Sequence, residues 1–425
     1  MLIAARPDYC VIFDLGDLLK SLVRALSVLA AALVWIFVAA SIVRSLAPLF
    51  RREYLQRAST FEFDQAVESA LAWLLTAALL LGCAAAWRIA RAEPLDARLR
   101  TQRSVLAVWP GWPLAIVGIA AAAAALLLMG MPPSTVPVLA SQMLGSYTFA
   151  AVPLTLAAAA AATGGRGKGA AALLAGPLVL ILSVGLLAEL PIASLTLAAC
   201  LPSAILAAGF AALAAVTGRE PLVWLAIGFA SVVAVALLLP PGFFTPTELL
   251  AVVSVLAIPI GLLVYSLNEG AFPWRVFTIG ADEILAASAA LALAVLIPRA
   301  LVFAFGEMPA PLSALPVWGV QLVAIVAMLA AGFVLTPILT ISLLAIFFFQ
   351  MLGPPSVGVG TVLMLAGVAA MILRSIDWTP GTEAHASLSL PRTTGLVGVT
   401  MVLAAVALSL ALWPAIESLL RGFLG

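Results

Sequence analysis

Long apolar runs separated by short polar stretches recur along the whole 425-residue chain. One helical crossing of a bilayer needs about 20 apolar residues, and by this criterion the pattern predicts about thirteen membrane segments. The predicted segments are 24–43, 68–90, 112–131, 143–163, 170–190, 194–216, 221–240, 247–267, 281–305, 316–335, 337–352, 355–373 and 394–415. Segment 337–352 is short and begins at Pro337, which interrupts a helix, so it either crosses the membrane or dips into it. We therefore expect an all-α polytopic transmembrane bundle of about 12–13 segments with a re-entrant hairpin.

Composition supports a lipid surrounding. Hydrophobic residues make up 64% of the chain and charged residues 9%, whereas soluble domains carry roughly 25% charged residues. A soluble enzyme, a disordered protein and a disulfide scaffold are excluded on this ground. The net charge of +1 gives no argument for a nucleic-acid partner. A single histidine, His385, and three scattered cysteines provide no metal-binding pattern.

Basic residues predict the topology. The segment 88–103 contains five arginines, whereas the loop 131–142 has no basic residue. Basic and uncharged loops then alternate, which places 88–111 in the cytoplasm by the positive-inside rule. Four arginines between the first two segments conflict with this assignment, namely Arg44, Arg51, Arg52 and Arg57. This stretch could lie in the interface as an amphipathic helix, and charge alone leaves its side of the membrane open.

The linker 91–108 is the most polar cytoplasmic stretch of the chain. We place the main boundary there, since charged and turn-forming residues concentrate between domains. The sequence thus predicts a two-span N-terminal region, 1–103, followed by a multi-span region, 104–425.

Three proline and glycine interruptions are candidates for functional breaks, namely 131–134, 240–248 and 353–360. Transporters bind substrates and ions where helices are broken near the membrane midplane. The first break is expected to be a surface turn. The second is expected to be a surface turn in which Thr245 and Glu248 form a capping box. The third joins two apolar pieces, and both a re-entrant hairpin and a tight surface turn remain open for it.

Charge inside an apolar run is the other signal. Arg299 lies within LAVLIPRALVFAF, directly after Pro298. An intramembrane arginine marks a substrate or ion path by default, and the alternative is that it reaches to the interface beside a helix break. Asp282 and Glu283 are expected to open the segment 281–305, where carboxylates favour the helix N-terminus.

Several stretches together resemble a known family. GFFTPTELLAVVSVLAIPIGLLVY (242–265), with Thr245, Pro246, Thr247 and Glu248, looks like the TPTE helix of the large membrane subunit of TRAP (tripartite ATP-independent periplasmic) transporters. LGPPSVGVG (352–360) is similar to the second hairpin of that subunit, with Gly353 where threonine is usual and Ser356 inserted. Further weaker similarities lie in 109–130, 144–165, 192–213 and 271–277, and residues 20–103 resemble the small membrane subunit.

The resemblance implies the membrane component of a secondary transporter that moves an organic anion such as a carboxylate. It also implies a periplasmic solute-binding protein, other TRAP membrane subunits and a lipid bilayer as partners, and Na⁺ as the coupling ion with no further cofactor. Substrate would be bound by Arg299, Ser356 and Gly358, and the ion by Gly353, Pro354, Pro355 and Gly360.

One departure from the family supports a second hypothesis. Where the family has its first hairpin, this chain has only a short alanine- and leucine-rich helix between Gly165 and about Glu189. The chain is then a degenerate relative that acts as a scaffold or partner subunit without transport. A membrane enzyme ranks last, because no histidine cluster, acidic motif or Ser/Lys pair lies within the spans. Arginine outnumbers lysine 18 to 2, a bias typical of GC-rich bacteria, so we expect a multi-pass protein of the bacterial inner membrane.

Overall fold

The computed structural model describes nine stretches of the chain together with a few single positions between them. These stretches are 15–51, 146–164, 169–188, 190–239, 245–269, 273–305, 316–334, 357–376 and 390–413. Side chains at both ends of the first helix and in the second half of the helix 274–305 are outside this description.

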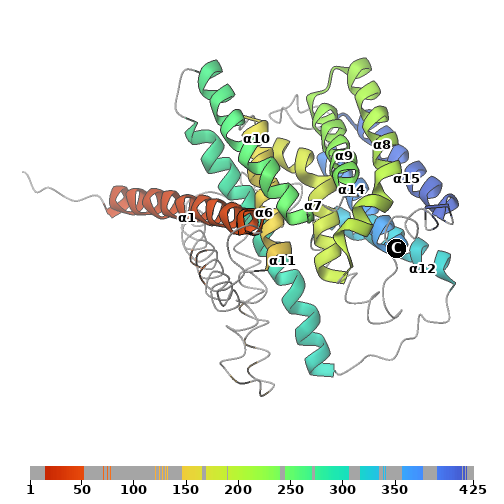
Figure 1. Ribbon diagram of the computed structural model, residues 1–425, viewed down its shortest axis with the longest axis horizontal. Coiled ribbons are helices and arrows are strands. Elements are labelled where there is room, and N and C mark those ends of the chain that lie inside the picture. The colour runs from red at the N-terminus through yellow and green to blue at the C-terminus, as the bar shows by residue number, and fades with distance from the viewer. Residues whose placement is uncertain are drawn as a thin grey trace, which may run out of the picture.

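The described stretches are helical, and the only β contact among them is an isolated parallel bridge between Ile376 and Leu390. The helices are α1 (Leu15–Arg51), α6 (Tyr147–Ala162), α7 (Ala170–Ala188), α8 (Ile192–Thr217), α9 (Glu220–Leu238), α10 (Pro246–Glu269), α11 (Trp274–Phe305), α12 (Val317–Val334), α14 (Val357–Ser375) and α15 (Arg392–Ala411). Seven helices in the described part of the chain are long and apolar enough to cross a membrane. The predicted all-α polytopic bundle is thereby confirmed, and the chain is a multi-pass membrane protein (Figure 1).

The helix boundaries follow the apolar runs closely except at two helices. Segments 68–90, 112–131 and 337–352 lie almost entirely outside the described residues. α1 continues through Arg44 to Arg51, although the sequence pattern ends the first segment at residue 43. α11 begins at Trp274 and not at residue 281, and it continues through Pro298. In both helices, charged residues end the apolar pattern in the sequence, but these residues lie within the observed helix.

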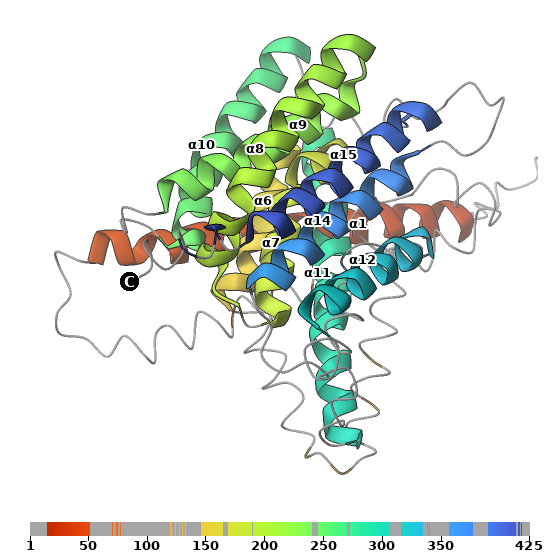
Figure 2. The same cartoon turned by 90° about the vertical axis from the view of Figure 1, so that its right-hand side faces the viewer.

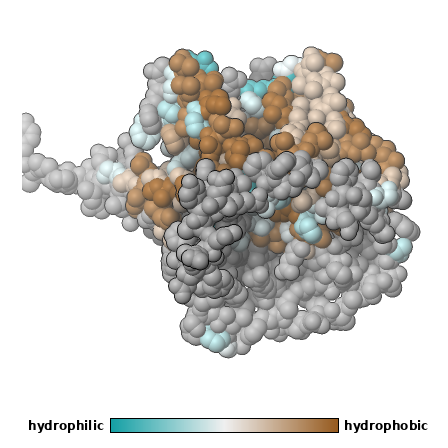
Figure 3. All heavy atoms as spheres, in the orientation of Figure 1, coloured by the Kyte–Doolittle hydropathy of each residue, from teal (hydrophilic) through white to brown (hydrophobic). Residues whose placement is uncertain are grey.

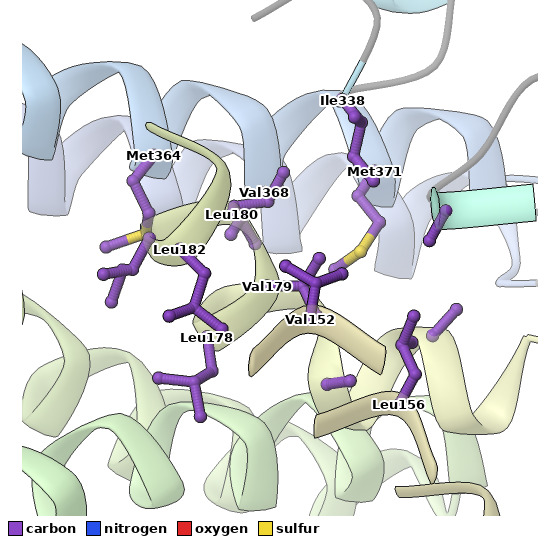
Figure 4. Packing of buried hydrophobic residues seen from close by; sticks show 14 of the residues in the cluster. Val152, Leu156, Leu178, Val179, Leu180, Leu182, Ile338, Met364, Val368 and Met371 are labelled. Carbon is purple, nitrogen blue, oxygen red and sulfur yellow. The ribbon is translucent and has the colours of Figure 1, made fainter. Parts of the chain in front are cut away.

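Two helices form the centre of the bundle. In the apolar stretches of α7 and α14, 89% of the residues are buried. α7 packs against α6, α9 and α14, and α14 packs against α7, α12 and α15 (Figure 2). Figure 4 shows Met364, Val368 and Met371 of α14 pointing toward α6 and α7. These two helices are therefore surrounded by protein and not by lipid.

Close helix crossings depend on small residues. A Cβ atom added to Gly261 of α10 would overlap with the backbone of Ala161 in α6. A Cβ atom on Gly228 of α9 would lie 2.6 Å from the carbonyl oxygen of Leu174 in α7. Small residues permit such close approach of backbones within a membrane. The alanine run 157–162 of α6 thus allows α10 to pack closely against it.

α1 lies across the bundle and packs against α6, α10 and α11 (Figures 1 and 2). Its Trp35 donates a hydrogen bond from Nε1 to the carbonyl oxygen of Phe277, at 2.9 Å. The rings of these two residues also meet edge to face, with centroids 4.9 Å apart. The first helix of the predicted N-terminal region is therefore packed onto helices of the region 104–425, while the boundary between the two regions remains a prediction.

Candidate functional site

The break before α14 is the strongest site candidate from sequence, and its first part lies outside the described residues. This applies to Gly353, Pro354, Pro355 and Ser356. Their assigned roles in binding an ion and a substrate remain predictions. The structure does describe the residues that follow them, which form the first turn of α14.

Gly358 and Gly360 lie in that first turn, and both are buried against apolar side chains. A Cβ atom on Gly358 would lie 2.9 Å from the indole ring of Trp413. A Cβ atom on Gly360 would lie 2.6 Å from Leu195 and 3.0 Å from Leu190. Glycine thus permits close packing at both positions, and this role is independent of their predicted roles as ligands.

The TPTE motif forms the start of α10. The backbone N–H of Thr245 donates to Glu248 Oε2 at 2.7 Å, and the N–H of Glu248 donates to Thr245 Oγ1 at 3.3 Å. Pro246 is the first helical residue, where its missing N–H costs nothing. The hydroxyl of Thr247 lies 3.2 Å from that of Thr245. This arrangement is the reciprocal capping box that the sequence predicts, so the motif has a structural role here.

The charged residues of α11 require one correction. Asp282 and Glu283 were expected to open this helix, but it begins at Trp274 and has no acidic residue in its first turn. Glu283 is instead a buried residue within the helix, at 4% exposure. Arg299 also belongs to α11, and its side chain lies outside those that the structure describes.

The sequence analysis missed a buried polar face on α1. Ser41, Arg44 and Ser45 are exposed by only 1%, 6% and 2%. Their spacing places them on one side of the helix. Ending the first segment at residue 43 had assigned Arg44 to a loop, whereas it lies within the apolar stretch Val28–Leu46. The spacing of three polar residues over five positions was the signal that could have identified this face.

Most other buried hydroxyl groups in the described helices are satisfied locally. Thr155 donates to the carbonyl oxygen of Ala151 at 2.8 Å, and Ser183 donates to that of Val179 at 2.7 Å. Ser254 donates to Leu250 within its own helix at 2.7 Å and also reaches the carbonyl oxygen of Leu154 in α6 at 3.2 Å. These contacts satisfy polar atoms inside an apolar bundle and indicate no ligand.

Three buried serine hydroxyls differ, because they have no hydrogen-bond partner among the described residues. They are Ser41 in α1, Ser203 in α8 and Ser288 in α11. Of the three, Ser41 is the one that shares a helix face with a buried charge, that of Arg44. The polar face of α1 is therefore the best-supported candidate site in the described part of the chain.

The described residues contain no group of three or more histidine, cysteine, aspartate or glutamate side chains that could hold a metal ion. Arg44 and the hydroxyl groups of Ser41 and Ser45 can interact with an anion. No protein-family model, curated protein or solved structure matches the chain.

Proposed function

We propose that the chain is the membrane component of a TRAP-type secondary transporter, moving an organic anion by ion coupling. The observation that carries this proposal is the position of α14. This helix directly follows the Gly/Pro break, and 89% of its apolar stretch is buried. A helix that starts at a break and is enclosed by other helices matches the discontinuous helices at which transporters bind substrate and ions.

The resemblance of 242–265 and 352–360 to the large TRAP subunit gives the proposal its specific form. On that basis, a periplasmic solute-binding protein delivers a carboxylate to the bacterial inner membrane, and Na⁺ is the coupling ion. Arg299 would meet the carboxylate, and the residues 353–360 would line the ion and substrate sites. Each of these roles is part of the proposal.

Uptake by the reconstituted protein tests the proposed transport function. The purified chain is placed in proteoliposomes together with any solute-binding protein encoded next to it, and uptake of labelled carboxylates is measured with and without an inward sodium gradient. We expect sodium-dependent uptake that requires the binding protein. Uptake that never exceeds that of empty liposomes would contradict the proposal.

Arg299→Ala isolates the predicted role of the intramembrane arginine. Losing one charge-assisted contact to a substrate should weaken apparent affinity by roughly 10-fold or more. The matched control is Arg219→Gln, because Arg219 is an exposed arginine in the turn between α8 and α9. Uptake by the Arg299→Ala variant at the wild-type level would remove Arg299 from the site.

One observation favours the second function, a scaffold or partner subunit without transport. α7 occupies the part of the sequence in which the family has its first hairpin, and α7 is a single continuous helix. Its one side-chain hydroxyl, that of Ser183, donates a hydrogen bond within the helix to the carbonyl oxygen of Val179. Co-purification of a complete TRAP membrane subunit from native membranes supports the scaffold function, and robust uptake by the chain alone excludes it.

A further inference from the structure

α1 reverses the usual order of polar and apolar residues over part of its length, because it buries three polar residues beside the buried apolar Val34, Phe37 and Val38 and exposes large apolar side chains. Its buried face contains Ser41, Arg44 and Ser45. Large apolar side chains lie on its exposed face, namely Val28 (58% exposed), Leu29 (48%), Ile36 (51%) and Val43 (70%). In a soluble protein a surface helix turns its polar face outward. The reversed arrangement is expected when lipid surrounds the helix and the protein interior holds the polar groups.

The hydroxyl of Ser41 is the second observation. It is 1% exposed, and its Oγ has no hydrogen-bond partner among the described residues. A buried hydroxyl without a partner is unfavourable, and a ligand that accepts its hydrogen would remove that cost. Ser41 and Arg44 are three residues apart, so their side chains are neighbours on the helix surface.

Arg44 supplies the charge. Its guanidinium has five N–H donors in a planar fork that matches the two oxygens of a carboxylate. Arg44 already has an interaction within the protein, and five donors leave capacity for a ligand beside it. The neighbouring helix α6 carries no charged residue, and α10 carries its two carboxylates, Glu248 and Glu269, at its ends. The third neighbour, α11, carries Asp282 and the buried Glu283.

We propose that Ser41, Arg44 and Ser45 form an intramembrane oxyanion site, which binds the carboxylate of the transported solute. The identity of this anion rests on the proposed function, whereas the existence of the site rests on the geometry of α1. An anionic lipid headgroup presents the same chemistry to a guanidinium, and it is the second source that the experiment separates.

Binding is measured on the full chain in nanodiscs of neutral phosphatidylcholine. Succinate is the soluble probe, and phosphatidylglycerol, added to the discs, is the lipid probe. We expect wild-type protein to bind succinate and Arg44→Gln to bind it at least roughly 10-fold more weakly, since a charge-assisted contact is lost. Ser41→Ala should weaken binding by roughly 3-fold to 10-fold, while Arg219→Gln should leave it unchanged.

Each other outcome has a definite meaning. Phosphatidylglycerol binding that depends on Arg44, without succinate binding, supports the oxyanion site and assigns it to lipid. Wild-type protein that binds neither probe overturns the proposal. So does an Arg44→Gln variant that loses thermal stability but binds succinate normally, because Arg44 would then only balance a buried carboxylate such as Glu283. Ser41→Ala keeps the inference testable if Arg44→Gln fails to fold.

The two proposals fail separately. Binding of succinate that depends on Arg44, without sodium-dependent uptake, leaves the site in place and rejects the transport function. Sodium-dependent uptake that is unaffected by Arg44→Gln and Ser41→Ala leaves the transport function in place and rejects the site.

Discussion

α7 and α10 are equally apolar but occupy different surroundings. The apolar stretches of both helices have a mean hydropathy of 2.4, yet 89% of that stretch is buried in α7 and 22% in α10. α7 is enclosed by other helices, whereas α10 contacts α6 and α1 and exposes a row of large apolar side chains, which form part of the apolar surface in Figure 3. Hydropathy thus reports apolar surroundings without distinguishing lipid from protein.

Small residues mark the part of α10 that crosses α6, although Leu249 and Leu250 at the start of the helix are buried as well. Leu256, Ile260 and Leu263 are each more than half exposed. Ala251 and Ser254 are buried, and Gly261 lies against Ala161 of α6. Small residues toward protein and large residues toward lipid are the arrangement expected where van der Waals packing drives helix association.

The largest expected effect comes from truncating a leucine in the central helix. Leu180→Ala in α7 removes a fully buried side chain (0% exposed) and should lower the free energy of unfolding by about 2–5 kcal/mol, because it leaves a cavity. Leu263→Ala in α10, at 59% exposure, should change it by no more than ~0.5 kcal/mol. Equilibrium unfolding in mixed micelles measures both. Equal losses would show that α10 is covered by protein.

An intermediate effect is expected where α10 does meet protein. Gly261→Ala should lower the free energy of unfolding by about 1–3 kcal/mol, because the new Cβ atom meets the backbone of Ala161, which cannot rotate away. Gly209→Ala in α8 is the control, since its Cβ atom would meet only the flexible end of Met401. The same unfolding assay should place the control within ~0.5 kcal/mol of wild type. A neutral Gly261→Ala would mean that α10 does not pack on α6 through this crossing.

The smallest effect is expected at the cap of α10. Thr245→Ala removes the hydrogen bond to the N–H of Glu248 and should cost about 1 kcal/mol, while Thr245→Ser should retain the bond. Amide hydrogen exchange in the first turn of α10 measures the change directly. Faster exchange is expected in Thr245→Ala alone. Unchanged exchange would indicate that neighbouring helices, and not the capping box, hold this end of α10.

The positions of most helices were predictable because apolar runs end at charged or turn-forming residues. The cap at Thr245 and Glu248 was predictable for the same local reason, since its atoms lie within four residues of one another. Two helices were misjudged, α1 at Arg44 and α11 at Asp282 and Glu283. A charge ends an apolar run in the sequence, but it need not end a helix when other helices enclose it.

The candidate site was less predictable, because it depends on contacts between distant segments. Gly360 resembles an ion ligand in a linear motif, and only the packed fold shows Leu190 and Leu195 against it. Ser41 looks like an ordinary small residue until the fold buries its side of α1. The sequence could mark a polar residue within an apolar run, but its burial comes from helices made much later in the chain.

The position of Arg44 has a consequence for biosynthesis. α1 emerges from the ribosome well before α6, α10 and α11, the helices against which it packs. Until those helices arrive, the guanidinium has to be held in water, in the headgroup layer or by the insertion machinery. Insertion of α1 and its docking onto the bundle are therefore two separate events in time, and the second waits for translation to pass Phe305, the last residue of α11.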